Sequence, residues 1–149
     1  MAFSLRSVLA PVDFGAGSDH SLQVALDLAK LTGAHVHVLH VYQIPVYGFP
    51  DGAFLAGPEI ATRLSEAAQK GLDNVVARVA ATGAQVTGHL RQGNPPEEIV
   101  AAAEELGVDT IVLGTHGRKG IAHAIMGSVA ERVVRTSPIP VLTARTPHE

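Results

Sequence analysis

The chain has 149 residues, of which 46% are hydrophobic and 17% charged, with a net charge of −3 and no cysteine. This length suits one domain, residues 1–149, with one core, and this composition excludes an intrinsically disordered chain. The acidic balance argues against nucleic acid or a membrane as partner, and the lack of cysteine excludes disulfides and thiolate metal sites. Because no apolar run is long enough for a membrane span or a cleaved leader, we expect a soluble, cytoplasmic protein.

Strand and helix patterns alternate along the chain. Short apolar runs with β-branched residues predict strands at 7–14, 34–42, 84–93, 108–114 and 138–145. Helices are predicted to start at Ser18, Pro58, Asn94 and Ser128, with Ser18, Asn94 and Ser128 as side-chain caps, and to stop near Gly33, Gly83, Gly107 and Pro138. Gly71 is expected to weaken the second helix by about 1 kcal/mol relative to alanine.

The order of these elements predicts the fold class. Strands that are apolar throughout and alternate with helices favour a parallel sheet covered on both faces, which is a doubly wound, Rossmann-like α/β fold. The strand at 84–93 is expected near an edge of the sheet, because His89 and Arg91 prefer water.

The segment from Gly114 to Ser128, GTHGRKGIAHAIMGS, connects the fourth strand to the fourth helix. Glycine allows close backbone approach, so Gly114 and Gly117 can direct successive amides toward one point. The helix N-terminus and the cations Arg118 and Lys119 add positive charge at the same corner. The segment therefore predicts an anion site, with Ser128 either capping its helix together with Glu131 or giving its hydroxyl to the ligand.

Two common phosphate-binding motifs are missing from the sequence. There is no G-x-x-x-x-G-K-[S/T] segment, so no P-loop lysine is present. After the first strand, Gly15 and Gly17 give only G-x-G, a weak dinucleotide signal. The glycine-rich corner must therefore be interpreted through its own spacing.

Four blocks in the same order carry a family resemblance. The corner has the form G-x-x-G-x9-G-[S/T], and it is accompanied by VLAPVDF, LHVY and SVAERVVRTSPIPVLTAR. With these blocks the chain resembles the universal stress protein family, in its nucleotide-binding branch, over nearly its whole length. The resemblance implies a five-stranded parallel sheet of order 3-2-1-4-5 with four helices. It also implies binding of ATP or AMP, with Mg²⁺ or Mn²⁺ accompanying ATP.

Carried over by position, the resemblance implies a set of binding residues. Adenine and ribose are expected near Pro11, Asp13 and Val41, although Asp13 could equally cap the following turn. Ribose and phosphates are expected near Gly114, Thr115, His116, Gly117, Arg118, Lys119, Gly120, Gly127, Ser128 and Val129. Lys119 departs from the family pattern, where a small or hydroxyl residue is common.

The last strand is expected to mediate self-association. In the order 3-2-1-4-5 this strand has one unpaired edge, and an apolar edge favours pairing with another strand. Family members commonly dimerise by antiparallel contact of this strand, so the resemblance implies a homodimer through Ile139 to Ala144.

Three functions follow as hypotheses. The first is an adenine-nucleotide-binding stress-response module that acts as a sensor or regulator. The second is a slow ATP-hydrolysing or phosphoryl-transfer enzyme, which ranks lower because no general base is identifiable beside the loop, so no catalytic residue is assigned. The third is a protein-interaction dimer with an empty site.

Other polar groups are predicted to have no chemical role. His35 and His37 form an H-x-H pair that can place two imidazoles on one face of a strand. Because no carboxylate or cysteine nearby completes a ligand set, we do not expect a metal site there. The glutamate pairs at 97–98 and 104–105 are expected to form a solvated helix face.

Overall fold

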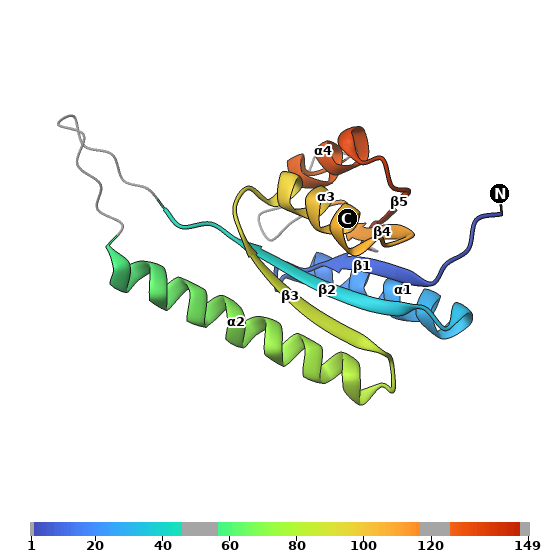
Figure 1. Cartoon of the computed structure of the whole chain (residues 1–149), viewed down its shortest axis with the longest axis horizontal. Coiled ribbons are helices and arrows are strands. Elements are labelled where there is room, and N and C mark those ends of the chain that lie inside the picture. The colour runs from blue at the N-terminus through green and yellow to red at the C-terminus, as the bar shows by residue number, and fades with distance from the viewer. Residues whose placement is uncertain (1, 46–56, 117–125, 147–149) are drawn as a thin grey trace.

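The computed structural model describes residues 2–45, 57–116 and 126–146 (Figure 1). In this part of the chain, strands and helices alternate as predicted. The strands are β1 (Ser7–Pro11), β2 (His35–Tyr42), β3 (Val86–Gln92), β4 (Thr110–Gly114) and β5 (Val141–Ala144). The helices are α1 (Ala16–Thr32), α2 (Pro58–Ala81), α3 (Pro95–Leu106) and α4 (Ser128–Thr136).

The five strands form one parallel sheet in the order β3-β2-β1-β4-β5. The fold class, the strand order and the edge position of β3 are therefore confirmed. In this order β1 lies at the centre of the sheet, and its chain leaves toward α1 while β4 leaves toward α4. Ligands of doubly wound sheets bind where such connections diverge, at the carboxyl ends of the strands.

The sheet is covered on both faces, so the molecule has one core on each face rather than the single core predicted from its length. Successive strand residues point to opposite faces. Val36 and Val38 of β2 pack in the core formed with α1 and α2, whereas Leu39 packs in the core formed with α3 and α4. Figure 1 shows α2 running along β3 and β2, with α3 and α4 gathered near β4 and β5. Figure 1 also shows the N-terminal end of the chain extending away from the sheet.

The turn after β1 differs from the prediction. The strand ends at Pro11 rather than residue 14, and α1 is capped by Gly15, so that Ser18 lies inside the first turn of the helix. Phe14 takes a left-handed backbone conformation with φ 66°, which is uncommon outside glycine. Its ring lies 4.1 Å from that of His40, centroid to centroid, and against Gly71 of α2. Packing of the Phe14 ring therefore holds a conformation that the sequence pattern does not indicate.

Gly71 is a contact point rather than a weak position in α2. A Cβ atom built on Gly71 would lie 2.7 Å from Cζ of Phe14, which is far below ordinary contact. We expect Gly71→Ala to destabilise the fold by about 1–2 kcal/mol, because overpacking outweighs the gain of about 1 kcal/mol in helix propensity. Urea unfolding measures the change, and a more stable variant would show that the Phe14 ring moves without cost.

The predicted side-chain caps are wrong at α3 and α4. Neither Asn94 nor Ser128 makes a side-chain cap hydrogen bond, and the cap residue of α4 is Gly127. Asn94 instead donates from Nδ2 to Oε2 of Glu97 at 2.6 Å. The side chain of Asn94 therefore holds a glutamate of the first turn instead of a main-chain amide.

The glutamates of α3 are mostly solvated, as predicted, although Glu98 is half-buried. Glu98 Oε1 lies 3.5 Å from Nε of Arg91 on β3, and Glu105 Oε2 lies 2.8 Å from Nη1 of the same arginine. The hydrogen bond with Glu105 raises the pKa of Arg91 and lowers that of Glu105. Because 65% of the Glu105 side chain is exposed, this pair orients α3 over the edge strand more than it stabilises the fold.

Candidate functional site

A cavity of about 360 Å³ opens at the carboxyl ends of the strands, which is within the range of small-molecule sites. Its walls come from β1, β2, β4, α1, α3 and α4 and from the turns that follow β1 and β4. The lining residues are Pro11, Val12, Asp13, Ser18, Leu39, Val41, Pro95, Ile99, Leu113, Gly114, Thr115, His116, Met126, Gly127, Ser128, Val129 and Ala130.

One part of the cavity is apolar. Leu39 and Leu113 are buried strand residues, and Ile99 of α3 packs beside them in the same core. Val41 and Met126 are partly buried against this core. Because these side chains lack hydrogen-bonding groups, they provide surfaces suited to a flat apolar ligand group.

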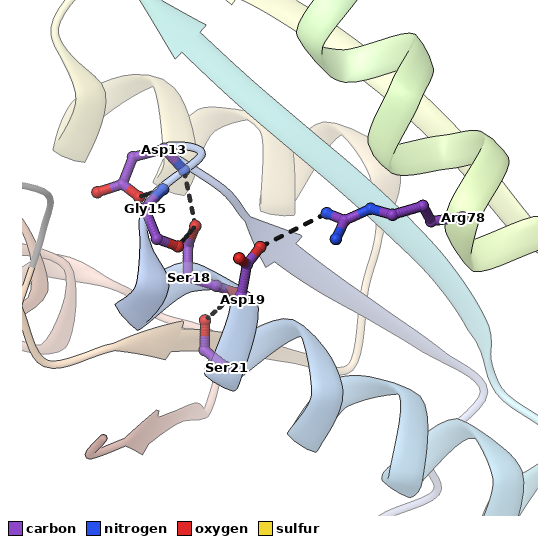
Figure 2. Close-up of polar contacts among 6 residues, drawn as sticks. All are labelled: Asp13, Gly15, Ser18, Asp19, Ser21 and Arg78. Atoms are coloured by element: carbon purple, nitrogen blue, oxygen red, sulfur yellow. Dashed lines mark hydrogen bonds and ion pairs between the residues drawn. The ribbon is translucent and has the colours of Figure 1, made fainter. Parts of the chain in front are cut away.

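Asp13 lines the cavity, and the turn after β1 holds its carboxylate (Figure 2). Its Oδ1 accepts a hydrogen bond from the Gly15 amide at 2.9 Å, and its own amide donates to Oγ of Ser18 at 3.2 Å. Ser18 in turn donates to the Gly15 carbonyl at 3.2 Å. The turn therefore fixes the position of the Asp13 carboxylate. One of its two oxygens caps the turn, as the capping interpretation proposed.

Other polar contacts drawn in Figure 2 lie on α1 and do not involve the cavity. Oδ1 of Asp19 lies 3.5 Å from Nη2 of Arg78 on α2, with both side chains more than half exposed. Ser21 donates to the Ser18 carbonyl at 3.1 Å. An exposed ion pair of this kind contributes little to stability, so we assign these groups to the surface and to the helix turn.

Close backbone packing fixes the start and the end of the glycine-rich segment. The Gly127 amide donates to the Thr115 carbonyl, and the Thr115 amide donates to the Ala144 carbonyl of β5 at 3.2 Å. A Cβ atom on Gly17 would lie 2.7 Å from the His116 carbonyl oxygen, and one on Gly114 would lie 3.1 Å from the Gly17 carbonyl oxygen. Glycine is therefore required where α1 crosses the end of β4.

The N-terminus of α4 faces the cavity through Gly127, Ser128 and Val129. The amides of a first helical turn have no partner within the helix, and no side chain in the described part of the protein caps the N-terminus of α4. Together with the positive end of the helix dipole, these amides favour an anion by roughly 0.3–1 kcal/mol, and more where the site is partly buried. The Ser128 hydroxyl is not used as a side-chain cap of α4.

A comparison with protein families confirms the family resemblance found in the sequence. The model of the universal stress protein family matches residues 4–145. The chain belongs to the universal stress protein family. It is 33% identical over 147 residues to the universal stress protein MJ0531 of Methanocaldococcus jannaschii, covering 95% of this chain and 83% of that one.

Solved structures of the family have the same architecture. The structure of protein MJ0577 of Methanocaldococcus jannaschii superposes with a TM-score of 0.81 at 26% identity, covering 97% of this chain and 98% of that one. The universal stress protein of Archaeoglobus fulgidus in complex with dAMP superposes with a TM-score of 0.64 at 25% identity, covering 95% and 98%. Fold and family are therefore established together.

The cavity of this universal stress protein contains most of the residues expected from the sequence. Nine of them line it: Pro11, Asp13, Val41, Gly114, Thr115, His116, Gly127, Ser128 and Val129. Gly117, Arg118, Lys119 and Gly120 lie outside the described residues. Their binding roles stay predictions.

Sequence reasoning missed three kinds of residue at this site. Ser18 was assigned as a helix cap, Gly17 was read as part of a weak glycine pair, and Ile99 was not singled out. Gly17 could have been found, because a glycine in the first turn of a helix after a central strand signals close backbone approach. Ile99 could not, because its place depends on how α3 packs on the sheet.

Three histidines form a separate polar cluster on β2 and β3. His37 Nδ1 lies 2.9 Å from His89 Nε2, and His35 Nε2 lies 2.8 Å from Oγ1 of Thr87. Burial lowers the pKa of His37 to about 4, aided by the nearby imidazoles of His35 and His89. Burial also lowers the pKa of His89, with His35 and Arg91 adding to the effect.

The cluster predicts a loss of stability in acid. His37 has a pKa of about 4 when folded and 6.5 when unfolded, so between these values the unfolded chain binds the extra proton. Its contribution is fully present above 6.5 and is lost as the pH falls toward 4. Urea unfolding at several pH values should show this decline, and His37→Gln should reduce its slope. An unchanged slope in His37→Gln, matching the control His20→Gln on α1, would contradict this prediction.

Proposed function

We propose that this chain binds an adenine nucleotide, ATP or AMP, in the cavity at the ends of β1 and β4, and acts as a sensor or regulator in a stress response. The observation that carries the proposal is the arrangement of the cavity. Apolar walls, the Asp13 carboxylate and the N-terminus of α4 surround one space of about 360 Å³. The family relative from Archaeoglobus fulgidus in complex with dAMP supports this class of ligand.

Each part of the nucleotide has a matching group in the cavity. The base is placed between Leu39, Val41 and Ile99, where its apolar faces leave water and the Val41 backbone can pair with its edge. The ribose hydroxyls donate to the Asp13 carboxylate, which gives charge-assisted hydrogen bonds. The phosphates lie at the first turn of α4, where amides and helix dipole favour negative charge.

A divalent ion bound with ATP would find few protein oxygen ligands in this cavity. Asp13 is the one carboxylate among the described residues that line the cavity. Mg²⁺ usually binds through one or two carboxylates together with substrate phosphates and water. The residues present therefore fit an ion that is held mainly by the nucleotide phosphates and water.

Calorimetric titration of the purified chain with AMP, adenosine and inorganic pyrophosphate tests the proposal. We expect saturable binding of AMP with one site per chain, with weaker binding of adenosine and of pyrophosphate, because each fills only part of the cavity. Native mass spectrometry of freshly purified protein should show a co-purifying nucleotide mass or one acquired from added AMP or ATP. Absence of saturable binding of AMP and ATP below about 1 mM, which corresponds to about −4.1 kcal/mol, would overturn the proposal.

We also infer that two copies associate through β5. This strand pairs with β4 alone in the described part of the chain, so one edge of its backbone remains unpaired. Leu142 on β5 and Val134 on α4 expose 37% and 46% of their surfaces. An apolar, unpaired edge favours addition of a strand from a second copy.

Disrupting this edge should give monomers. We expect Leu142→Glu to shift the mass from dimer to monomer by light scattering at micromolar concentration, because a buried, unpaired carboxylate is costly. Leu31→Glu is the matched control, since Leu31 on α1 is 83% exposed and lies far along the chain from β5. A wild-type monomer, or a Leu142→Glu dimer, would contradict this assignment.

A further inference from the structure

The histidines of β2 and β3 come together because the two strands are paired in parallel. His37 is in register with Thr87 and Leu39 is in register with His89. Alternate residues of a strand share one face, so His35, His37, Thr87 and His89 all lie on the same side of the sheet. The ring centroids of His35 and His37 are 4.5 Å apart, and those of His37 and His89 are 5.1 Å apart.

This side of the sheet is only partly covered at these positions. The side chains of all three histidines are partly exposed, whereas Leu39, the next β2 residue on the same face, is fully buried under α3 and α4. Helix α2 packs on the opposite face, against Val36 and Val38. The imidazoles are therefore accessible to a small solute from one side.

Two ring nitrogens face each other in this cluster. The distance of 2.9 Å between Nδ1 of His37 and Nε2 of His89 allows one shared proton, because one nitrogen must donate and the other accept. Two imidazole nitrogens bound at about 2.05 Å to one tetrahedral metal ion lie roughly 3.3 Å apart. If Nδ1 of His37 and Nε2 of His89 move apart by a few tenths of an ångström, a metal ion bonded to both nitrogens can therefore replace the hydrogen bond.

We propose that His37 and His89 form a binding site for a borderline transition-metal ion such as Zn²⁺ or Ni²⁺. The neutral rings offer lone pairs, and imidazole favours these metals over Mg²⁺ and Ca²⁺, which prefer oxygen ligands. The metal takes the place of the shared proton, which moves to the outer nitrogen of its own ring, so that each ligand remains a neutral imidazole. Water completes the coordination.

The site is limited to two protein ligands. No group of three or more histidine, aspartate or glutamate side chains is placed to hold a metal ion in residues 2–45, 57–116 and 126–146. His35 is oriented toward Thr87, to which its Nε2 is hydrogen-bonded. The expected affinity is therefore below that of a closed three- or four-ligand zinc site.

Burial and nearby charges both affect the histidine pair, and burial has the larger effect. Arg91, two residues after His89 on β3, lies beside the cluster, and its charge is shared with Glu98 and Glu105 of α3. Burial lowers the pKa values of His37 and His89, so both rings stay unprotonated at neutral pH and need not release a proton to bind the metal.

Calorimetric titration of the nucleotide-free, untagged full chain with ZnCl₂ or NiCl₂ tests the proposal. We expect one saturable ion per chain, with affinity reduced at least about ten-fold in His37→Gln and in His89→Gln, since even loss of a supporting partner of a metal ligand costs this much. His20→Gln, on α1, serves as the matched control and should bind as the wild type does. Loss of binding in His20→Gln, or unchanged binding in His37→Gln and His89→Gln, would overturn the site.

A second measurement does not depend on any variant. Zinc added to the wild-type chain should shift the imidazole NMR signals of His37 and His89 and leave that of His20 in place. Shifts confined to other histidines, or no shift at saturating zinc, would contradict the proposal. Because nucleotide is absent from both experiments, their outcome is independent of the cavity.

Discussion

Replacing Asp13 with asparagine is expected to weaken binding of AMP by about 10- to 100-fold. Hydrogen bonds to a charged group contribute roughly 1.5–3 kcal/mol, and each 1.4 kcal/mol is a factor of about ten. Asparagine keeps an oxygen that can accept from the Gly15 amide, so the turn after β1 should survive. The loss of AMP affinity therefore reports the contribution of the Asp13 carboxylate and not a change in the fold around it.

The ligand provides the control for this prediction. The monophosphate of 2′,3′-dideoxyadenosine lacks both ribose hydroxyls, so it cannot donate to Asp13. We expect the wild type and Asp13→Asn to bind it with nearly equal affinity by calorimetry. If Asp13→Asn weakens binding of AMP and of the dideoxy analogue equally, Asp13 acts through the turn. If the wild type and Asp13→Asn bind AMP with equal affinity, Asp13 does not contact the ribose.

The variant Gly17→Ala is expected to lose at least about ten-fold in AMP affinity and to destabilise the fold by about 1–3 kcal/mol. The added methyl would lie 2.7 Å from the His116 carbonyl oxygen, and moving main chain costs more than moving the end of a flexible side chain. The backbone at His116, where the glycine-rich segment begins, must then shift away from α1. Calorimetry and urea unfolding measure the two effects.

Gly57→Ala is the matched control for this substitution. Gly57 precedes α2, and a Cβ atom there would meet nothing within 4 Å. We expect this variant to bind AMP as the wild type does, with a stability change limited to the weaker helix cap. If Gly17→Ala also binds normally, the contact between α1 and the end of β4 does not shape the site.

Much of the fold could be predicted because its signals are local. Strand composition and glycine positions define five strands and four helices, and Gly33 and Gly107 take the left-handed conformation that ends α1 and α3. The strand order came from the family resemblance. Boundaries were less accurate after β1, where the conformation of Phe14 depends on Gly71 and His40, far along the chain.

The candidate site, like the fold, could be predicted from the sequence only in part. Asp13, Gly114 and Ser128 could be placed at strand ends and a helix start, where topology brings them together. The apolar wall from Ile99 and the pairing of His37 with His89 depend on packing and on strand register, which periodicity cannot supply. The histidine on β3 was therefore missed as a neighbour of the H-x-H pair on β2.

The most direct test of nucleotide binding is a titration of the isotope-labelled chain with AMP, followed by NMR of the backbone amides. We predict saturable shifts at Val12, Val41, Thr115 and Val129, around the cavity, and none at Gly83 and Gln85, at the opposite end of the molecule. Saturable shifts that avoid the cavity, or no shifts at millimolar AMP, would contradict the account.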